Sequence, residues 1–205
     1  MNTEPVPAGP PDPPRVAWRR QMRARVLDEA WLLASLSGWD AVRVADLARR
    51  AEVSRPSIYA EFGDRAGVGR ALVLRETDRF LAGVGGVLEG NGGDVAAGLH
   101  AAVAHTLGEA RTNPFIGAVV TAARGGTDAL LPFLTSRPEP VFSQARSLVT
   151  AWLDVVAEEC PSARRAEAAD VAVRLTLSHM LLPSSEGDAA AARVARAAYA
   201  VLGPV

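Results

Sequence analysis

The fold is decided by residues 41–65, which read AVRVADLARRAEVSRPSIYAEFGDR. Leu47 and Ala48 form the inner face of a first short helix, and Ala48 is small enough to let two helices cross closely. Ile58 and Phe62 lie four residues apart, which places them on one face of a second helix. The spacing therefore predicts two short helices joined by a tight turn.

The second helix is predicted to run over residues 54–62. Ser54 can cap it, and Pro56 falls in its first turn, where the missing N–H costs nothing. The outward face carries polar groups short enough to reach a base edge in the major groove of DNA: Arg55, Ser57, Tyr59 and Glu61. A generic helical hairpin would share the apolar spacing, so this pattern favours DNA binding without deciding it.

Helical periodicity continues on both sides of this stretch. From Arg15 to Ser37 one apolar stripe comprises Met22, Val26, Ala30, Leu33 and Ala34. Asp64 can cap a long helix over residues 65–87. Further helices are expected at 94–111, 114–123, 138–159, 164–182 and 188–202. No segment alternates with period two for long enough to form a strand, so the predicted fold is all-α.

Composition excludes several classes of protein. The formal net charge is −1, but five arginines fall within residues 15–25 with no acid among them, which suits a partner rich in phosphate. Cys160 is the only cysteine, so an internal disulfide is impossible and a cysteine-based zinc site is not expected. Motifs of zinc enzymes and serine hydrolases are absent, so we expect no metal, no cofactor and no enzymatic activity. No long apolar run or signal peptide is recognised, and a cytoplasmic location without membrane contact is expected.

From Trp18 to about Val73 the sequence resembles the N-terminal domain of TetR-family repressors. The resemblance rests on the motif at residues 54–62, which reads SRPSIYAEF, and on the basic residue that follows it at Arg65. It implies a three-helix DNA-binding domain with a helix-turn-helix over residues 15–64. A ligand-binding and dimerisation domain would follow over 65–205, and the proline-rich residues 1–14 would be a disordered tail.

The resemblance also implies which residues contact DNA. Tyr59, Ser57 and Arg55 would reach phosphates or bases, and Arg65 would bind the backbone at the start of the fourth helix. Three positions depart from the family pattern. Arg43 replaces a frequent threonine and adds a charge, whereas Glu52 replaces the usual turn glycine and makes a costlier left-handed turn. Glu61 replaces a common histidine, and it either accepts a hydrogen bond from cytosine or pairs with an arginine. The candidate DNA-binding residues are Arg43, Ser54, Arg55, Ser57, Tyr59, Glu61 and Arg65.

The remaining helices are apolar with a few polar interruptions, a composition typical of a small-molecule pocket. The candidate ligand-binding residues are His105, Phe115, Val120, Thr121, Arg124, Phe133, Leu148, Trp152, Ser178 and His179. By the resemblance, the last two helices form a four-helix dimer interface. Its candidate residues are Val171, Leu175, Leu182, Val194 and Ala198.

Much of residues 95–185 also resembles regulators of operons for lactone and acyl-homoserine-lactone degradation, or quorum quenching. The stretches that carry this resemblance are 113–115, 130–137, 151–153 and 174–183. It implies an elongated amphipathic effector such as a lactone, an acyl-homoserine lactone or a fatty acid. The predicted function is a homodimeric repressor that binds a palindromic operator in double-stranded DNA and is released by this effector. Two alternatives remain open: an activator of the same fold, and a helical protein-interaction module without DNA binding.

Overall fold

The part of the chain that the structure describes consists of helices and the loops that join them, as the sequence predicts. The computed structural model describes residues 14–125, 139–183 and 187–203, and within these ranges it contains no strand. The elements are α1 (Pro14–Ser37), η1 (Trp39–Ala41), α2 (Val44–Arg50), α3 (Arg55–Phe62), α4 (Arg65–Glu89), α5 (Val95–Thr112), α6 (Pro114–Gly125), α8 (Glu139–Val156), α9 (Ser162–Leu181) and α10 (Gly187–Leu202). None of these helices is both long and apolar enough to span a membrane.

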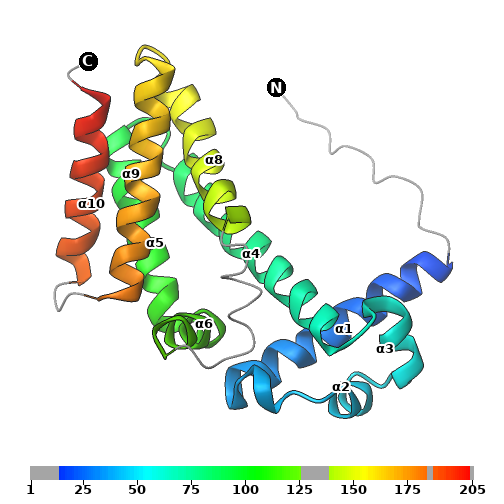
Figure 1. Cartoon of the computed structure of the whole chain (residues 1–205). Helices are drawn as coiled ribbons and strands as arrows, with labels where there is room; N and C mark the ends of the chain where they lie inside the picture. Colours follow the sequence, from blue (N-terminus) through cyan, green and yellow to red (C-terminus); the bar gives the residue numbers. More distant parts are fainter. Residues whose placement is uncertain (1–13, 126–138, 184–186, 204–205) are drawn as a thin grey trace.

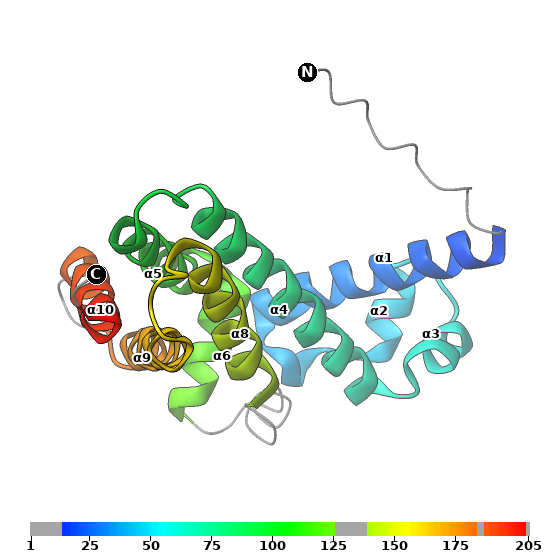
Figure 2. The same ribbon diagram turned by 90° about the horizontal axis from the view of Figure 1, so that it is seen from above.

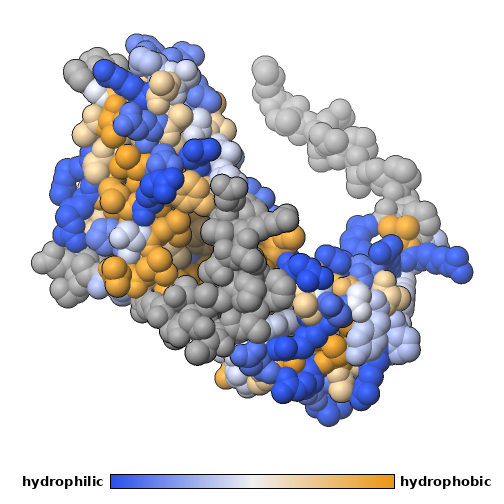
Figure 3. Space-filling model, viewed as in Figure 1, coloured by the Kyte–Doolittle hydropathy of each residue, from blue (hydrophilic) through white to orange (hydrophobic). Residues whose placement is uncertain are grey.

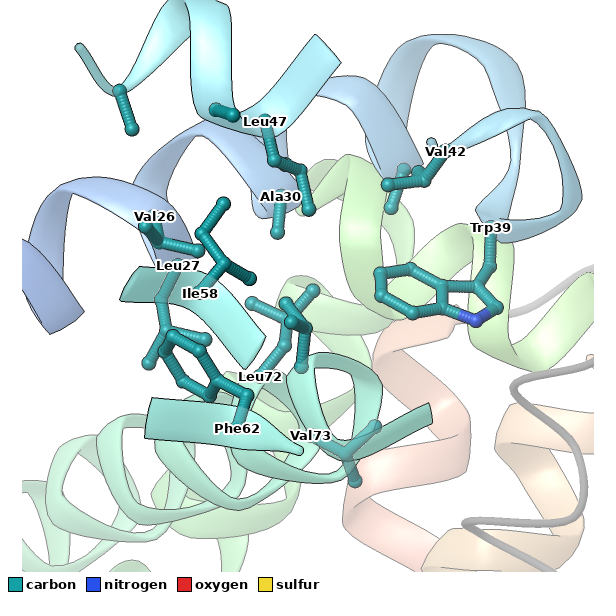
Figure 4. Close-up of a cluster of buried hydrophobic side chains, with 14 of the residues drawn as sticks. Val26, Leu27, Ala30, Trp39, Val42, Leu47, Ile58, Phe62, Leu72 and Val73 are labelled. Carbon is teal, nitrogen blue, oxygen red and sulfur yellow. The ribbon is translucent and has the colours of Figure 1, made fainter. Parts of the chain in front are cut away.

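Helices α1, α2 and α3 and the first half of α4 surround one hydrophobic core, which we call the N-terminal core. Its members include Val26, Leu47, Ile58 and Leu72, none of which has any exposed surface. Their side chains converge from all four helices (Figure 4). The apolar spacing of the α2–α3 stretch is therefore used as expected, with α2 packed on α1 and α3 packed on α4.

Helix α4 connects this core to the rest of the molecule. Seen from above, α4 runs from the α1–α3 group at one end toward the helices α9 and α10 at the other (Figure 2). Its second half packs with α5 and α8, while α10 packs on α9 and α5 (Figure 1). Val84 and Leu88 of α4 belong to a second core, the C-terminal core, together with buried residues of α5, α8, α9 and α10.

Several boundaries differ from the prediction. The α1 helix begins at Pro14, inside the predicted tail, and the 3-10 turn η1 after Gly38 was not foreseen. The end of α8 lies at Val156, three residues earlier than expected. After this end, the guanidinium of Arg165 donates to the carbonyl oxygens of Glu158 (3.0 Å) and Cys160, which satisfies two acceptors of the turn that follows the helix.

Candidate DNA-binding surface and ligand cavity

The start of α3 is fixed by local hydrogen bonds. The Oγ of Ser54 accepts a bond from the backbone N–H of Ser57 at 3.1 Å, and the two serine hydroxyls lie 2.8 Å apart. Pro56 stands in the first turn, where it removes no helical hydrogen bond. Ser54 is thus a helix cap. The side chains of Arg55 and Tyr59 are exposed on α3, Tyr59 with 49% of its surface accessible.

Glu61 does not belong to this exposed face. Its carboxylate pairs with Arg19 and with Arg23 of α1, the latter at 3.0 Å, and only 7% of the side chain is exposed. Arg23 also stacks on the ring of Phe62, 5.0 Å from its centre. The expectation that Glu61 reads a base is corrected by this geometry, because both arginines hold the carboxylate against α1. The alternative pairing with an arginine is what the structure contains.

Two of the candidate DNA-contacting arginines hold the connection between α1 and α2. Arg65 donates to the carbonyl oxygen of Trp39, lies over its indole ring at 5.2 Å and stands 3.7 Å from the carboxylate of Asp40. Arg43 donates to the carbonyl oxygens of Asp40 and Val42. The resemblance did not imply this role, and no local pattern in the sequence signals it.

A cavity of about 630 Å³ lies among α4, α5, α6, α8 and α9. Its wall is mainly apolar and includes Phe80, Val84, Leu99, Val141 and Phe142. Among the described lining residues, the side chains with polar groups are Glu76, Thr77, Thr106, Arg174 and Thr176. Apolar walls with a few polar groups can bind a small molecule and orient it.

Three of the predicted ligand-binding residues line this cavity: Phe115, Val120 and Leu148. Others lie elsewhere. His105 faces Gly83 of α4, where its Nε2 is 3.1 Å from the position that a Cβ atom would occupy, and neither Ser178 nor His179 lines the cavity. Trp152 packs against Gly98 of α5 so closely that a Cβ atom there would lie 2.5 Å from its ring, and it is not part of the wall.

The remaining predictions for the ligand site concern residues without a described side chain. Phe133 lies outside the described residues, and Thr121 and Arg124 belong to a part of α6 whose side chains are not described. These three assignments stay predictions.

None of the candidate ligand-binding residues lies on α4, although this helix supplies several lining residues. Val73, Thr77, Phe80, Leu81 and Val84 follow the spacing of one helical face, and all of them except Thr77 are apolar. A single acid, Glu76, interrupts that face. An acid on an otherwise apolar helix face is the sequence signal that could have identified this face as the wall of a site for a ligand with a polar head group.

Two family models match the chain. The model described as "Bacterial regulatory proteins, tetR family" matches residues 26–72. The model described as "Bacterial Tetracyclin repressor, C-terminal domain" matches residues 94–199, just over half of the 205 residues. The chain belongs to the TetR family of transcriptional regulators.

Individual relatives agree with this assignment. The HTH-type transcriptional regulator AlkX of Mycobacterium tuberculosis is 30% identical over 185 residues, which cover 88% of this chain and 84% of that protein. The TetR-family repressor AlkX from Dietzia sp., implicated in biodegradation of n-alkanes, has a TM-score of 0.67 at 23% identity, covering 87% of this chain and 94% of its own. The fatty acid degradation regulator FadR from Bacillus halodurans has a TM-score of 0.56 at 16% identity, with coverages of 90% and 96%.

In this TetR-family chain, the predicted dimer residues separate into two groups. Val194 and Ala198 of α10 are buried within the single chain, where they pack on α5 and α9, so they are not available to a partner. Leu175 and Leu182 are exposed, and Val171 lies on the same face of α9. The stripe on α10 was assigned to the wrong contact because periodicity identifies an apolar face but not what covers it.

The turn of the helix-turn-helix has the left-handed geometry that the sequence predicted. Glu52 has a φ of 55°, and it is the one non-glycine residue with positive φ in the described part of the chain. A side chain in this conformation costs roughly 1–2 kcal/mol. We therefore expect Glu52→Gly to be more stable than Glu52→Ala by roughly 1 kcal/mol, after allowing for the greater backbone entropy of an unfolded glycine.

This difference is measured by urea unfolding followed by circular dichroism, with both variants at one protein concentration. Alanine is the matched control, because it removes the same charge while it keeps a Cβ atom. Equal stability of the two variants would show that the turn carries no conformational cost.

Proposed function

We propose that this TetR-family regulator is a homodimeric repressor whose operator binding is relieved by a small ligand with an aliphatic chain. The observation that carries the proposal is that one helix, α4, forms part of the N-terminal core and part of the cavity wall. Val73 belongs to both, and so does Phe115 of α6. A ligand that displaces these side chains would displace the core on which the helix-turn-helix is built.

The chemistry of the cavity supports the aliphatic class of effector. A mainly apolar wall around about 630 Å³ gains free energy from burying hydrocarbon. The Dietzia repressor named AlkX is implicated in biodegradation of n-alkanes, and the M. tuberculosis relative carries the same name. The relatives described above do not support the narrower assignment to lactone degradation. An acyl-homoserine lactone remains a candidate effector through its acyl chain.

The contact between α4 and α1 supports coupling of the cavity to the DNA-binding helices. Arg75 of α4 donates to the carbonyl oxygen of Leu27 at 3.1 Å and to the carboxylate of Asp28 at 2.7 Å, both on α1. A shift of α4 would therefore move α1, and with it the α3 helix that Glu61 holds there. Two recognition helices must stand about 34–36 Å apart to read consecutive major grooves. A shift of a few ångströms would end operator binding.

The exposed face of α9 supports dimerisation. In the view of Figure 1, an apolar patch covers the α9 side of the C-terminal helices, and hydrophilic residues surround it (Figure 3). Leu175 of α9 and Leu182, just after its end, are exposed, Val171 one turn before Leu175 is half-buried, and Tyr199 of α10 is half-exposed. Apolar patches of this kind on soluble proteins mark interfaces. A two-fold pair would present two α3 helices to a palindrome.

Replacing Tyr59 by alanine is expected to abolish operator binding and leave the fold intact, because the side chain is exposed on α3. The measurement is a gel-shift titration with DNA from around the protein's own gene, with circular dichroism as the check on folding. Leu36→Ala, at an exposed position on α1, is the control and should bind like the unmodified protein. Operator affinity that survives in Tyr59→Ala would argue against α3 as the recognition helix.

An unmodified protein that binds no DNA would instead favour the protein-interaction module. A free acid at Glu61 would repel phosphate and so favour that alternative. Its pairing with Arg19 and Arg23 removes this reason.

Filling the cavity should separate ligand response from DNA binding. Ala145 of α8 lines the wall, and Ala145→Phe would occupy space that an aliphatic chain needs. We expect this variant to bind operator DNA but to resist release by octanol or octanoate. Ala151→Phe, at an exposed position on the same helix, should respond like the unmodified protein. Full release of Ala145→Phe from DNA would place the effector outside this cavity.

A charge on the exposed face of α9 should prevent pairing of two chains. Leu182 is 76% exposed, and Leu182→Glu would place a carboxylate where the proposed interface is apolar. The expected result is a monomer in analytical ultracentrifugation. Val155→Glu, on α8 and also 76% exposed in the single chain, is the matched control and should stay dimeric. A dimeric Leu182→Glu would mean that another face forms the interface.

A further inference from the structure

One acid stands in the otherwise apolar wall of the cavity. Glu76 is the only carboxylate among the described lining residues, and 13% of its side chain remains exposed. A charged group in such a place is costly unless hydrogen bonds stabilise it. The bonds that Glu76 makes therefore decide what it can offer to a ligand.

Its two carboxylate oxygens are used unequally. Oε1 accepts from Nε of Arg75 at 2.9 Å and from Nη1 of Arg79 at 3.1 Å. Oε2 has no hydrogen-bond partner among the described residues. An ionised carboxylate has about four acceptor positions, so Glu76 keeps capacity for further donors. This free capacity belongs to a residue of the cavity wall, next to the helix contact that Arg75 makes with α1.

The other charged lining residue is already compensated. Arg174 donates through Nε to Asp170 at 2.6 Å, and its guanidinium lies over the ring of Phe142 at 4.6 Å. A ligand carboxylate would have to compete with Asp170 for this arginine, and an ionised carboxylate has no hydrogen to donate to the free oxygen of Glu76. The charges of the wall thus favour a neutral donor over an anion.

We propose that Glu76 binds the polar head of the effector, which is an aliphatic chain that ends in an O–H or N–H donor. This inference rests on the proposed function, because it places the head group of the same effector in the same cavity. A long-chain alcohol and the amide of an N-acyl-homoserine lactone share this chemistry. The O–H or N–H group of a bound ligand would share the carboxylate of Glu76 with Arg75. The other hydrogen bonds of Arg75 join α4 to α1.

The test is isothermal titration of the full-length protein with four ligands of one chain length: octane, octanol, octanoate and N-octanoyl-homoserine lactone. A hydrogen bond to a charged group makes binding at least about tenfold tighter. We therefore expect octanol, the lactone or both to bind about tenfold more tightly than octane, and octanoate to bind more weakly than either preferred donor. Whichever donor is preferred identifies the source of the head group.

Glu76→Gln is the decisive variant, because it keeps the size of the side chain and removes its charge. The preference for donors over octane should fall to about threefold or less, and octanoate should bind more tightly than it does to the unmodified protein. Asp78→Asn removes one negative charge from an exposed position of the same helix and should leave the ranking unchanged. Circular dichroism confirms that both variants fold.

The possible failures are distinguishable. If all four ligands bind alike, if octanoate binds best, or if Glu76→Gln keeps the original ranking, Glu76 does not hold the head group. Release of operator DNA by these same ligands would then leave the proposed function standing. If none of the four ligands binds, the aliphatic effector class is overturned together with this inference.

Discussion

Helix α4 packs in two hydrophobic cores at once, and the rest of the structure depends on that double packing. Val68 and Leu72 are fully buried in the N-terminal core, while Leu88, sixteen residues beyond Leu72, is buried in the C-terminal core. The helix has 25 residues and spans about 37 Å. Close-packed cores resist gradual deformation, so a displaced side chain at one end moves the helix as a unit. In the proposed function, this rigidity is what joins recognition of DNA to recognition of a ligand.

The arginines of the N-terminal helices have two roles, one structural and one in the proposed binding of DNA. Arg19 and Arg23 bind Glu61, and Arg65 binds the η1 turn, so these side chains set the position of α3 and α4 before any DNA is present. Arg55 is exposed on α3 and stays available to the proposed DNA partner. An orientation fixed in advance lowers the entropy lost on binding. The same residue type therefore serves both the architecture and the recognition.

Features that depend on neighbours in the sequence could be predicted from it. The caps at Ser54 and Asp64 and the order of the main helices follow from spacing and residue type, whereas the left-handed turn at Glu52 follows from the resemblance to TetR-family repressors, which usually have a glycine there. The pairing of Glu61 could not be derived in this way, since its partner Arg19 lies 42 residues earlier. The same reason applies to the lining of the cavity. A stripe such as Val194 and Ala198 shows that a face is apolar, but only the packed structure shows whether a neighbouring helix, a ligand or a second chain covers it.

The close contact of Gly98 with Trp152 has a consequence for how such a regulator can diversify. Trp152 is held against bare backbone, which brings α8 near α5, and Leu148 and Val149 on the preceding turn of α8 form part of the cavity wall. A side chain at position 98 would overlap the indole and force it to shift, and Leu148 and Val149 are its near neighbours on the same helix. The width of the cavity thus depends in part on the missing side chain at position 98, which is not a lining residue. Under the proposed function, a substitution at this one position would change the accepted chain length without altering a residue that lines the cavity.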